Sequence, residues 1–187
     1  MRSCEGSMAI VMDDPSANLV AMTIRLEPVV GDALKRAAER EGQEVADYAA
    51  RVLIEHVLPL IEQSNPPSAR RLQAEIEVKA RAIALAKQLS PEQAFDPNVT
   101  LKVFQAIREE DELRQLYIRA IGDRPSDERG NPIKARVNRT LGAAIKTAVR
   151  AMPKTIDGNP MKVQVSNEFI FSYTQLEPPP GAKLARV

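Results

Sequence analysis

The sequence predicts a mainly α-helical protein with a small amount of β structure. Apolar residues recur at helical spacing through most segments between residues 28 and 151, whereas β-like alternation is confined to residues 19–26 and 161–173. We expect five successive parts: a flexible arm (1–17), a strand–helix–helix module (18–62), a linker with a connecting helix (63–90), a C-terminal α+β module with a basic helix (91–176) and a flexible tail (177–187).

The first expected element is a short strand over residues 19–26. Its alternation gives an apolar face and an outward face, which consist of Met22, Ile24 and Leu26 and of Ala21, Thr23 and Arg25. A strand this short is not stable alone, and no hairpin mate lies nearby in the sequence. The simplest partner is the same segment of a second copy, which would give a two-stranded antiparallel ribbon across a dyad.

Two helices are expected to follow the strand. Pro28 suits a first helical turn, Gly42 suits a left-handed cap, and the second helix should end or kink near Leu58-Pro59. Their apolar stripes are formed by Val30, Leu34, Ala37 and Ala38 and by Val45, Ala49, Leu53 and Val57. These faces are too small to close a core in one chain, but two copies could close one.

This stretch resembles the ribbon-helix-helix family, the fold of the Arc and MetJ type repressors. The resemblance rests on the strand at 22–26, the face at 34–38, the interhelical Gly42 and the following Val45, and it covers about 40 of the 187 residues. It implies a homodimer whose ribbon enters the major groove of double-stranded DNA and reads bases with its outward residues. By position these residues are Ala21, Thr23 and Arg25, of which Arg25 could donate two hydrogen bonds to guanine.

One position departs from that family. Ser or Thr commonly opens the second helix there, where amide groups grip a phosphate, but this chain has Gln43-Glu44-Val45. Glu44 suits the helix dipole but would repel a phosphate. An ordinary alternating strand and helical hairpin inside an α/β core is the alternative interpretation of residues 19–57.

The middle of the chain predicts a linker and a long helix. Residues 63–68 form the clearest linker, and a helix with a thin apolar stripe should run from Ala69 to about Leu89. This helix would connect the two modules, pair with its dimer mate, or pack as a plain solvated helix on the next domain.

Helix-capping residues, prolines and glycines are expected to divide the C-terminal module into short elements. Helices should begin at Ser90-Pro91 and at Asp96-Pro97, and the charged run 108–112 should separate a further helix that ends at Gly122. Asn131-Pro132 should start a helix running to about Ala151, followed by strands at 161–165 and 168–173 with a tight turn at Ser166-Asn167. Such an order is compatible with a winged helix-turn-helix, although we recognise no family for residues 91–176.

The helix expected over 131–151 carries a stripe of one charge sign. Residues 131–154 contain no acid, and an arc of roughly 80° on a helical projection holds Arg136, Arg139, Lys146, Arg150 and, if the helix reaches it, Lys154. Lys134 falls on the apolar side, in the first turn, where its long side chain can reach water. Because like charges on one face repel, the stripe favours an anionic partner such as phosphate. A solvated face balanced by acids such as Glu109–Glu112, or an acidic protein partner, would also account for it.

Composition excludes several classes of activity. The chain has one cysteine and one histidine, too few for an internal disulfide or a zinc site, and it has no glycine-rich phosphate loop. We therefore expect no enzymatic activity, no metal and no cofactor. No apolar run is long enough to span a membrane, and the start lacks the core of a secretion signal, so we expect a cytoplasmic protein.

Charge is distributed unevenly along the chain. Residues 1–62 hold six Lys/Arg and eleven Asp/Glu, a net of −5, whereas residues 63–187 have a net of +6. The leading hypothesis is a homodimeric DNA-binding transcriptional regulator that uses the ribbon and the basic helix together. The alternative is an antitoxin or assembly adaptor whose C-terminal module binds a partner protein. An RNA or single-strand binder is disfavoured because aromatic residues make up only 4% of the chain.

Overall fold

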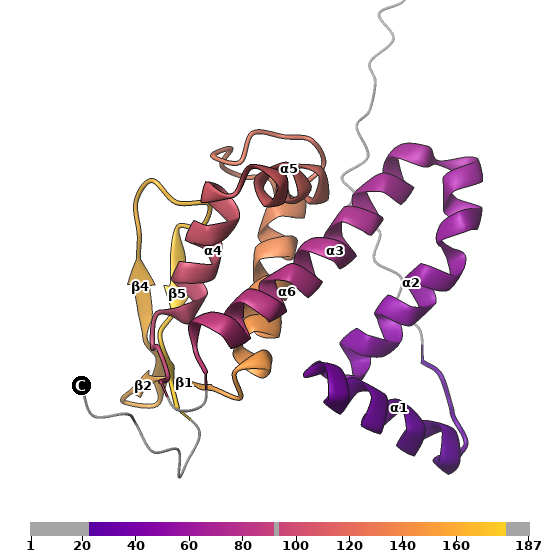
Figure 1. The fold of residues 1–187 in the computed structure, drawn as a ribbon, viewed down its shortest axis with the longest axis horizontal. Helices are drawn as coiled ribbons and strands as arrows, with labels where there is room; N and C mark the ends of the chain where they lie inside the picture. Colours follow the sequence, from indigo (N-terminus) through magenta and orange to yellow (C-terminus); the bar gives the residue numbers. More distant parts are fainter. Residues whose placement is uncertain (1–22, 92–93, 179–187) are drawn as a thin grey trace, which may run out of the picture.

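The computed structural model describes residues 23–91 and 94–178, which form six helices and three two-stranded antiparallel sheets (Figure 1). The helices are α1 (Pro28–Glu41), α2 (Val45–Ser64), α3 (Pro66–Leu89), α4 (Val99–Glu109), α5 (Asp111–Ala120) and α6 (Pro132–Ala148). The strands are β1 (Met152–Pro153), β2 (Thr155–Ile156), β3 (Asn159–Pro160), β4 (Lys162–Gln164), β5 (Ser172–Thr174) and β6 (Leu176–Glu177). The prediction of a mainly helical chain with little β structure is confirmed. The expected arm, residues 19–22 of the expected strand, and residues 179–187 of the expected tail lie outside the described residues.

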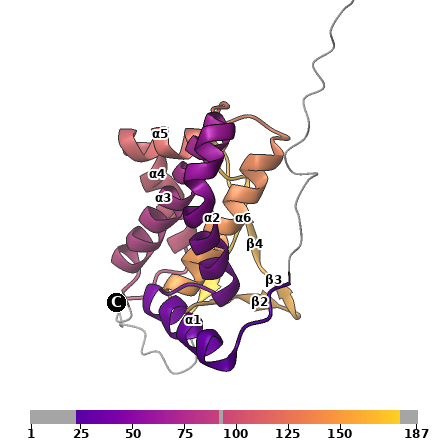
Figure 2. The same cartoon turned by 90° about the vertical axis from the view of Figure 1, so that its right-hand side faces the viewer.

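The first helical pair forms where the sequence predicts it. Gly42 ends α1 with a φ of 66°, a left-handed conformation that costs a glycine little, and its N–H donates to the Glu39 carbonyl at 3.1 Å. Helix α2 begins at Val45, and α1 crosses beneath its lower end in Figure 2. The cap residue, rather than packing, fixes this boundary, so the sequence alone was sufficient to locate it.

The linker predicted at residues 63–68 is wrong. Helix α2 continues through the exposed Pro59 to Ser64, α3 begins at Pro66, and only Asn65 lies between them. The Asn65 side chain accepts a hydrogen bond from the Ser68 N–H at 3.2 Å and so caps α3, while Pro66 needs no N–H partner in a first turn. Residues that suit a loop by composition therefore form a helix–helix corner.

Helix α3 lies at the centre of the molecule rather than outside the packed module (Figure 1). Its small residues are buried in one core with side chains of α4, α5, α6 and the C-terminal strands: Ala74, Val78, Ala82 and Ala86. Alanine lets neighbouring helices approach closely, which explains why the stripe looks thin in the sequence. On its other side α3 packs against α2, where Lys79 Nζ lies 3.2 Å from an Asp47 carboxylate oxygen.

No helix begins at Ser90-Pro91, because Pro91 and residues 94–98 are not helical, and the helix expected from Asp96-Pro97 begins later, at Val99. The Ser90 hydroxyl instead accepts from the Asp96 N–H at 2.9 Å, which holds a turn ahead of α4. The break between α4 and α5 within the charged run 108–112 is confirmed at Glu110, and Gly122 follows α5 with a φ of 88°.

The hairpin after α6 has a longer loop than predicted. Strands β4 and β5 pair with Val163 opposite Tyr173, so residues 165–171 form the connection instead of a tight turn at 166–167. Phe169 and Ile170 in this loop are buried, and the Phe169 ring stacks on the Tyr117 ring at 4.9 Å between centroids. Burial of these two residues overrides the alternation that suggested a strand.

Candidate nucleic-acid interface

The N-terminal segment presents its predicted DNA-contacting residues to solvent. Thr23 and Arg25 are exposed, residues 23–27 belong to no strand within the single chain, and Ala21 lies outside the described residues. The segment precedes α1 directly, and Pro28 starts the helix after Glu27 in an extended conformation. Its side chains are therefore available to a second molecule.

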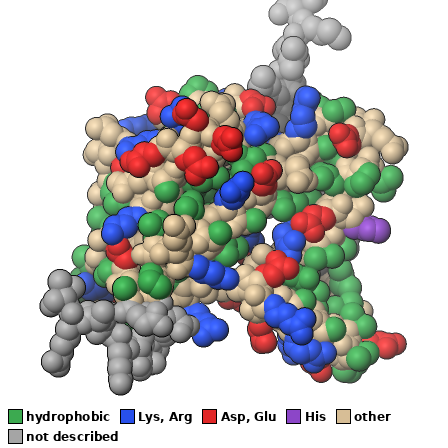
Figure 3. All heavy atoms as spheres, viewed as in Figure 1, with side chains coloured by type: hydrophobic (Ala, Val, Ile, Leu, Met, Phe, Trp, Pro, Cys, Tyr) green, Lys and Arg blue, Asp and Glu red, His purple; other side chains and the backbone are tan. Residues whose placement is uncertain are grey.

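The apolar faces of the first two helices are also open. Ile24 is 52% exposed, Leu26 and Val30 are each 48% exposed, Leu53 is 47% exposed and Val57 is 36% exposed. Figure 3 shows hydrophobic side chains along the outer side of α2, where the single histidine, His56, is exposed as well. Helix α1 buries Ala38, and α2 buries none of its residues fully.

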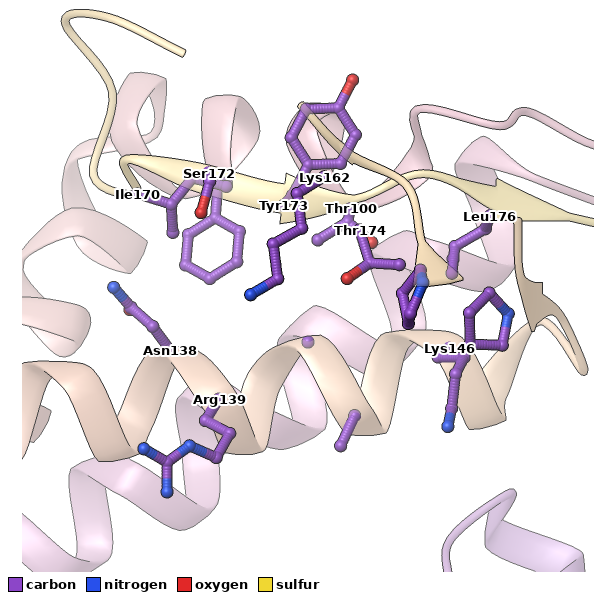
Figure 4. A pocket seen from close by; sticks show the side chains of 15 residues that line it. Thr100, Asn138, Arg139, Lys146, Lys162, Ile170, Ser172, Tyr173, Thr174 and Leu176 are labelled. Carbon is purple, nitrogen blue, oxygen red and sulfur yellow. The ribbon is translucent and has the colours of Figure 1, made fainter. Parts of the chain in front are cut away.

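A second candidate surface is a groove of about 490 Å³ between α6 and the β4–β5 hairpin (Figure 4). Its lining combines three cationic side chains with hydroxyl groups and an apolar floor. The cations are Arg139 and Lys146 from α6 and Lys162 from β4. No Asp or Glu is among the described residues that line it.

The cations of the groove have no ionic partners among residues 23–91 and 94–178. In Figure 4, Lys162 extends from the hairpin toward α6, while Arg139 and Lys146 extend from the opposite side of that helix. Arg139 is exposed and Lys146 is half-buried. The charges therefore line the rim of the groove rather than converge on one point.

Arg136, predicted to belong to the same stripe, is instead paired within the fold. Its guanidinium donates to both carboxylate oxygens of Glu75 on α3, at 2.5 and 2.7 Å. Arg71 also reaches Glu75, at 3.3 Å, and burial lowers the pKa of Arg71. This bidentate pair joins α6 to α3, so Arg136 keeps 32% of its side chain exposed but is neutralised within the fold rather than left for an anionic partner.

Arg150 and Lys154 lie beyond the end of the basic helix. Helix α6 ends at Ala148, Arg150 adopts a positive φ of 52°, and Lys154 sits between β1 and β2. Lys154 Nζ donates to the Gln175 side-chain oxygen at 3.3 Å. Both residues are exposed, but the helix expected to run to about Ala151 ends at Ala148, so it includes neither Arg150 nor Lys154.

Lys134 is buried, although a first-turn lysine was expected to reach water. Its ammonium donates to the Glu128 carbonyl at 3.3 Å and lies 4.9 Å from the Phe171 ring centroid. Burial lowers the pKa of Lys134, while the charges of Asp127 and Glu128 act in the opposite direction. The polar loop before α6 folds over this side chain, which helical periodicity alone does not reveal.

Two tyrosines fix the hairpin relative to the helices that form the groove. Tyr117 donates to Asn138 at 2.7 Å, and Asn138 in turn donates to the Phe169 carbonyl at 3.4 Å. Tyr173 on β5 donates to Asn98 at 2.7 Å. Burial raises the pKa of both tyrosines, so each keeps its proton and its role as a donor at neutral pH.

Lys162 is the groove residue that the helical stripe does not identify. The sequence signal for Lys162 is its place at the start of a β-like stretch that follows a basic helix. Period-2 alternation in that stretch places Lys162 and Gln164 on the face opposite Val163.

Neither a membrane span nor a metal centre is found in the part of the chain that the structure describes. Of the helices within it, none is both long and apolar enough to cross a bilayer. The same residues contain no group of three or more His, Cys, Asp or Glu side chains arranged to hold a metal ion. No family model, curated protein or solved structure matches this chain.

Proposed function

We propose that this chain is a homodimeric DNA-binding protein that regulates transcription, in which two copies of residues 19–26 pair as a β-ribbon. One observation carries the proposal: Ile24, Leu26 and Val30, together with Leu53 and Val57, are exposed in the single chain. These positions belong to the strand face and the two helical faces that the sequence assigns to a core shared by two copies. A ribbon-helix-helix dimer would cover these faces.

Covering these side chains favours association. Full burial of a Val, Leu or Ile side chain stabilises by about 1.5–3 kcal/mol, and these residues start 36–52% exposed, so each contributes a fraction of that value. Pairing also supplies backbone partners to residues 23–26, which belong to no strand in the monomer.

The outward side chains of such a ribbon suit base recognition. Thr23 and Arg25 are exposed on the segment, and an arginine can donate two hydrogen bonds to guanine in the major groove. Arg139 and Lys146 on α6 would add phosphate contacts, which strengthen binding without reading sequence.

The alternative, an antitoxin or adaptor with a partner-binding C-terminal module, has less support. Side chains between Ala74 and Leu176 already form one core within the single chain. A segment that folds only on its partner would lack such a core. A folded module that docks a protein remains compatible with the fold, and the test below separates it from DNA binding.

The test compares two glutamate substitutions in the full chain. Leu26→Glu places a charge on the proposed interface, whereas Val29→Glu places one on a valine that is 67% exposed and outside the predicted stripe. We expect sedimentation equilibrium to show a dimer for wild type and Val29→Glu and a monomer for Leu26→Glu.

DNA binding should follow the same order. Selection of bound sequences from a random duplex library should return a palindromic site for the wild type and for Val29→Glu, and none for Leu26→Glu. Arg25→Ala should relax the preference at guanine, at a cost of about 1–3 kcal/mol. A monomeric wild type, or a wild type that selects no sequence, would refute the proposal.

A further inference from the structure

We propose that the groove between α6 and the β4–β5 hairpin is a binding site for the phosphate backbone of duplex DNA, in which Lys162 of the hairpin acts together with Arg139 and Lys146. The inference rests on the proposed function and deepens it, because it adds Lys162 and the hairpin to the phosphate contacts of Arg139 and Lys146, far along the chain from the ribbon. It gives the hairpin a role that the basic helix alone does not imply.

The spacing of the charges suits an extended polyanion. Arg139 and Lys146 are seven residues apart on α6, which corresponds to about 10 Å along the helix axis. Lys162 faces α6 from the hairpin (Figure 4). A single small anion would require these groups to converge, whereas one DNA strand presents a charge about every 3.4 Å along the duplex axis.

Neutral donors lie beside Lys162 on the hairpin. Ser172 and Thr174 on β5 direct their hydroxyl groups toward α6 in Figure 4, and Lys162 pairs directly with Thr174 in the sheet register. Hydroxyl groups of Ser and Thr commonly donate to phosphate oxygens in protein–DNA complexes. The hairpin wall therefore offers a charged donor and two neutral donors, and Arg139 and Lys146 extend α6's contribution along the outer rim of the groove.

The charge of the groove favours an anionic occupant. No Asp or Glu lines the groove among the described residues, and its three cations lack ionic partners there, whereas Arg136 on the same helix is neutralised by Glu75. Within the described residues, the cations that border the groove are therefore not compensated by acidic side chains. An acidic protein surface could meet the same charges, and it forms an outcome of the experiment.

The experiment measures binding of the full chain to a short duplex of arbitrary sequence by fluorescence anisotropy over a series of NaCl concentrations. We expect Lys162→Gln, Arg139→Gln and Lys146→Gln each to lower affinity and to reduce the slope of log K against log salt by about 0.9 for each groove that contacts the duplex. Arg81→Gln is the matched control, because Arg81 is an exposed helical arginine that lines a different, acid-bordered pocket. It should leave the slope unchanged.

The outcome for Lys162→Gln decides the proposal. If the slope and the affinity of Lys162→Gln equal those of the wild type, the groove does not bind the DNA backbone and the inference is overturned. A groove that instead binds an acidic protein would give this same result. Circular dichroism melting confirms that each variant folds.

Combining Lys162→Gln with Thr23→Ala and Arg25→Ala separates this inference from the proposed function. The ribbon changes should abolish sequence preference yet leave the salt slope that depends on Lys162. If they leave preference intact while Lys162→Gln still reduces the slope, the ribbon proposal fails and the groove site stands.

Discussion

Single cations on one helix have different roles in this protein, and their neighbours decide which. Arg139 is exposed beside the groove, Lys134 is buried under Phe171, and Arg136 is paired with Glu75. A helical projection correctly separates Lys134 from the others but treats Arg136 and Arg139 alike. The difference comes from α3, whose position relative to α6 is not encoded in the sequence of α6.

Arg136 should therefore matter for stability rather than for binding. Arg136→Gln removes the two charge-assisted bonds to Glu75, and we expect urea denaturation to show a loss of about 1–2 kcal/mol in the free energy of unfolding, because the pair is partly exposed. The slope of DNA affinity against salt should stay at the wild-type value. A reduced slope with an unchanged free energy of unfolding would show instead that Arg136 contributes to the proposed DNA-binding surface.

At the scale of elements, helix boundaries follow capping residues closely where the cap is local. Gly42 and Asn131-Pro132 mark ends that the sequence locates, because the bonds they make are within a few residues. The corner at Asn65 uses the same chemistry, but its Ser, Asn and Pro residues also suit a loop. The 165–171 loop could not be predicted, since it depends on Phe169 meeting Tyr117 from a distant helix.

The two asparagine residues that cap helices should differ in their contribution to the free energy of unfolding. Asn131 is buried; its side chain accepts from the Lys134 N–H at 3.0 Å and donates to the Ile121 carbonyl at 3.3 Å, whereas Asn65 is exposed and makes only the capping bond. We expect Asn65→Ala to cost about 1 kcal/mol and Asn131→Ala about 2 kcal/mol or more, measured by urea denaturation. Equal losses would show that the second Asn131 bond adds nothing.

At the scale of the whole molecule, burial is concentrated in the C-terminal two thirds. The core draws on α3 to α6 and the strands that follow, while α1 and α2 contribute one fully buried residue, Ala38. The apolar pattern of α3 did not reveal the extent of this core, because alanines carry little hydrophobic signal on their own. The groove likewise needed the whole fold, since its two walls come from separate elements.

Limited proteolysis should reveal this asymmetry. Sites within α1 and α2 should be cut first, because few of their contacts are buried, and the resistant fragment should begin near Pro66 and extend to about residue 178. Mass spectrometry of the digest identifies its ends. A resistant fragment beginning near residue 90 would mean that α3 does not belong to the stable unit. DNA that carries the selected site should slow the early cuts.

The corner at Asn65 joins α1 and α2 to the C-terminal part of the chain without a flexible linker. One residue separates α2 from α3, and the Lys79–Asp47 ion pair joins the same two helices, so their relative orientation is constrained. In the proposed dimer, two such chains paired through the segments that precede α1 would hold their two C-terminal grooves at a defined distance from each other. The length of duplex that such a pair spans would then be decided by the protein before any DNA arrives.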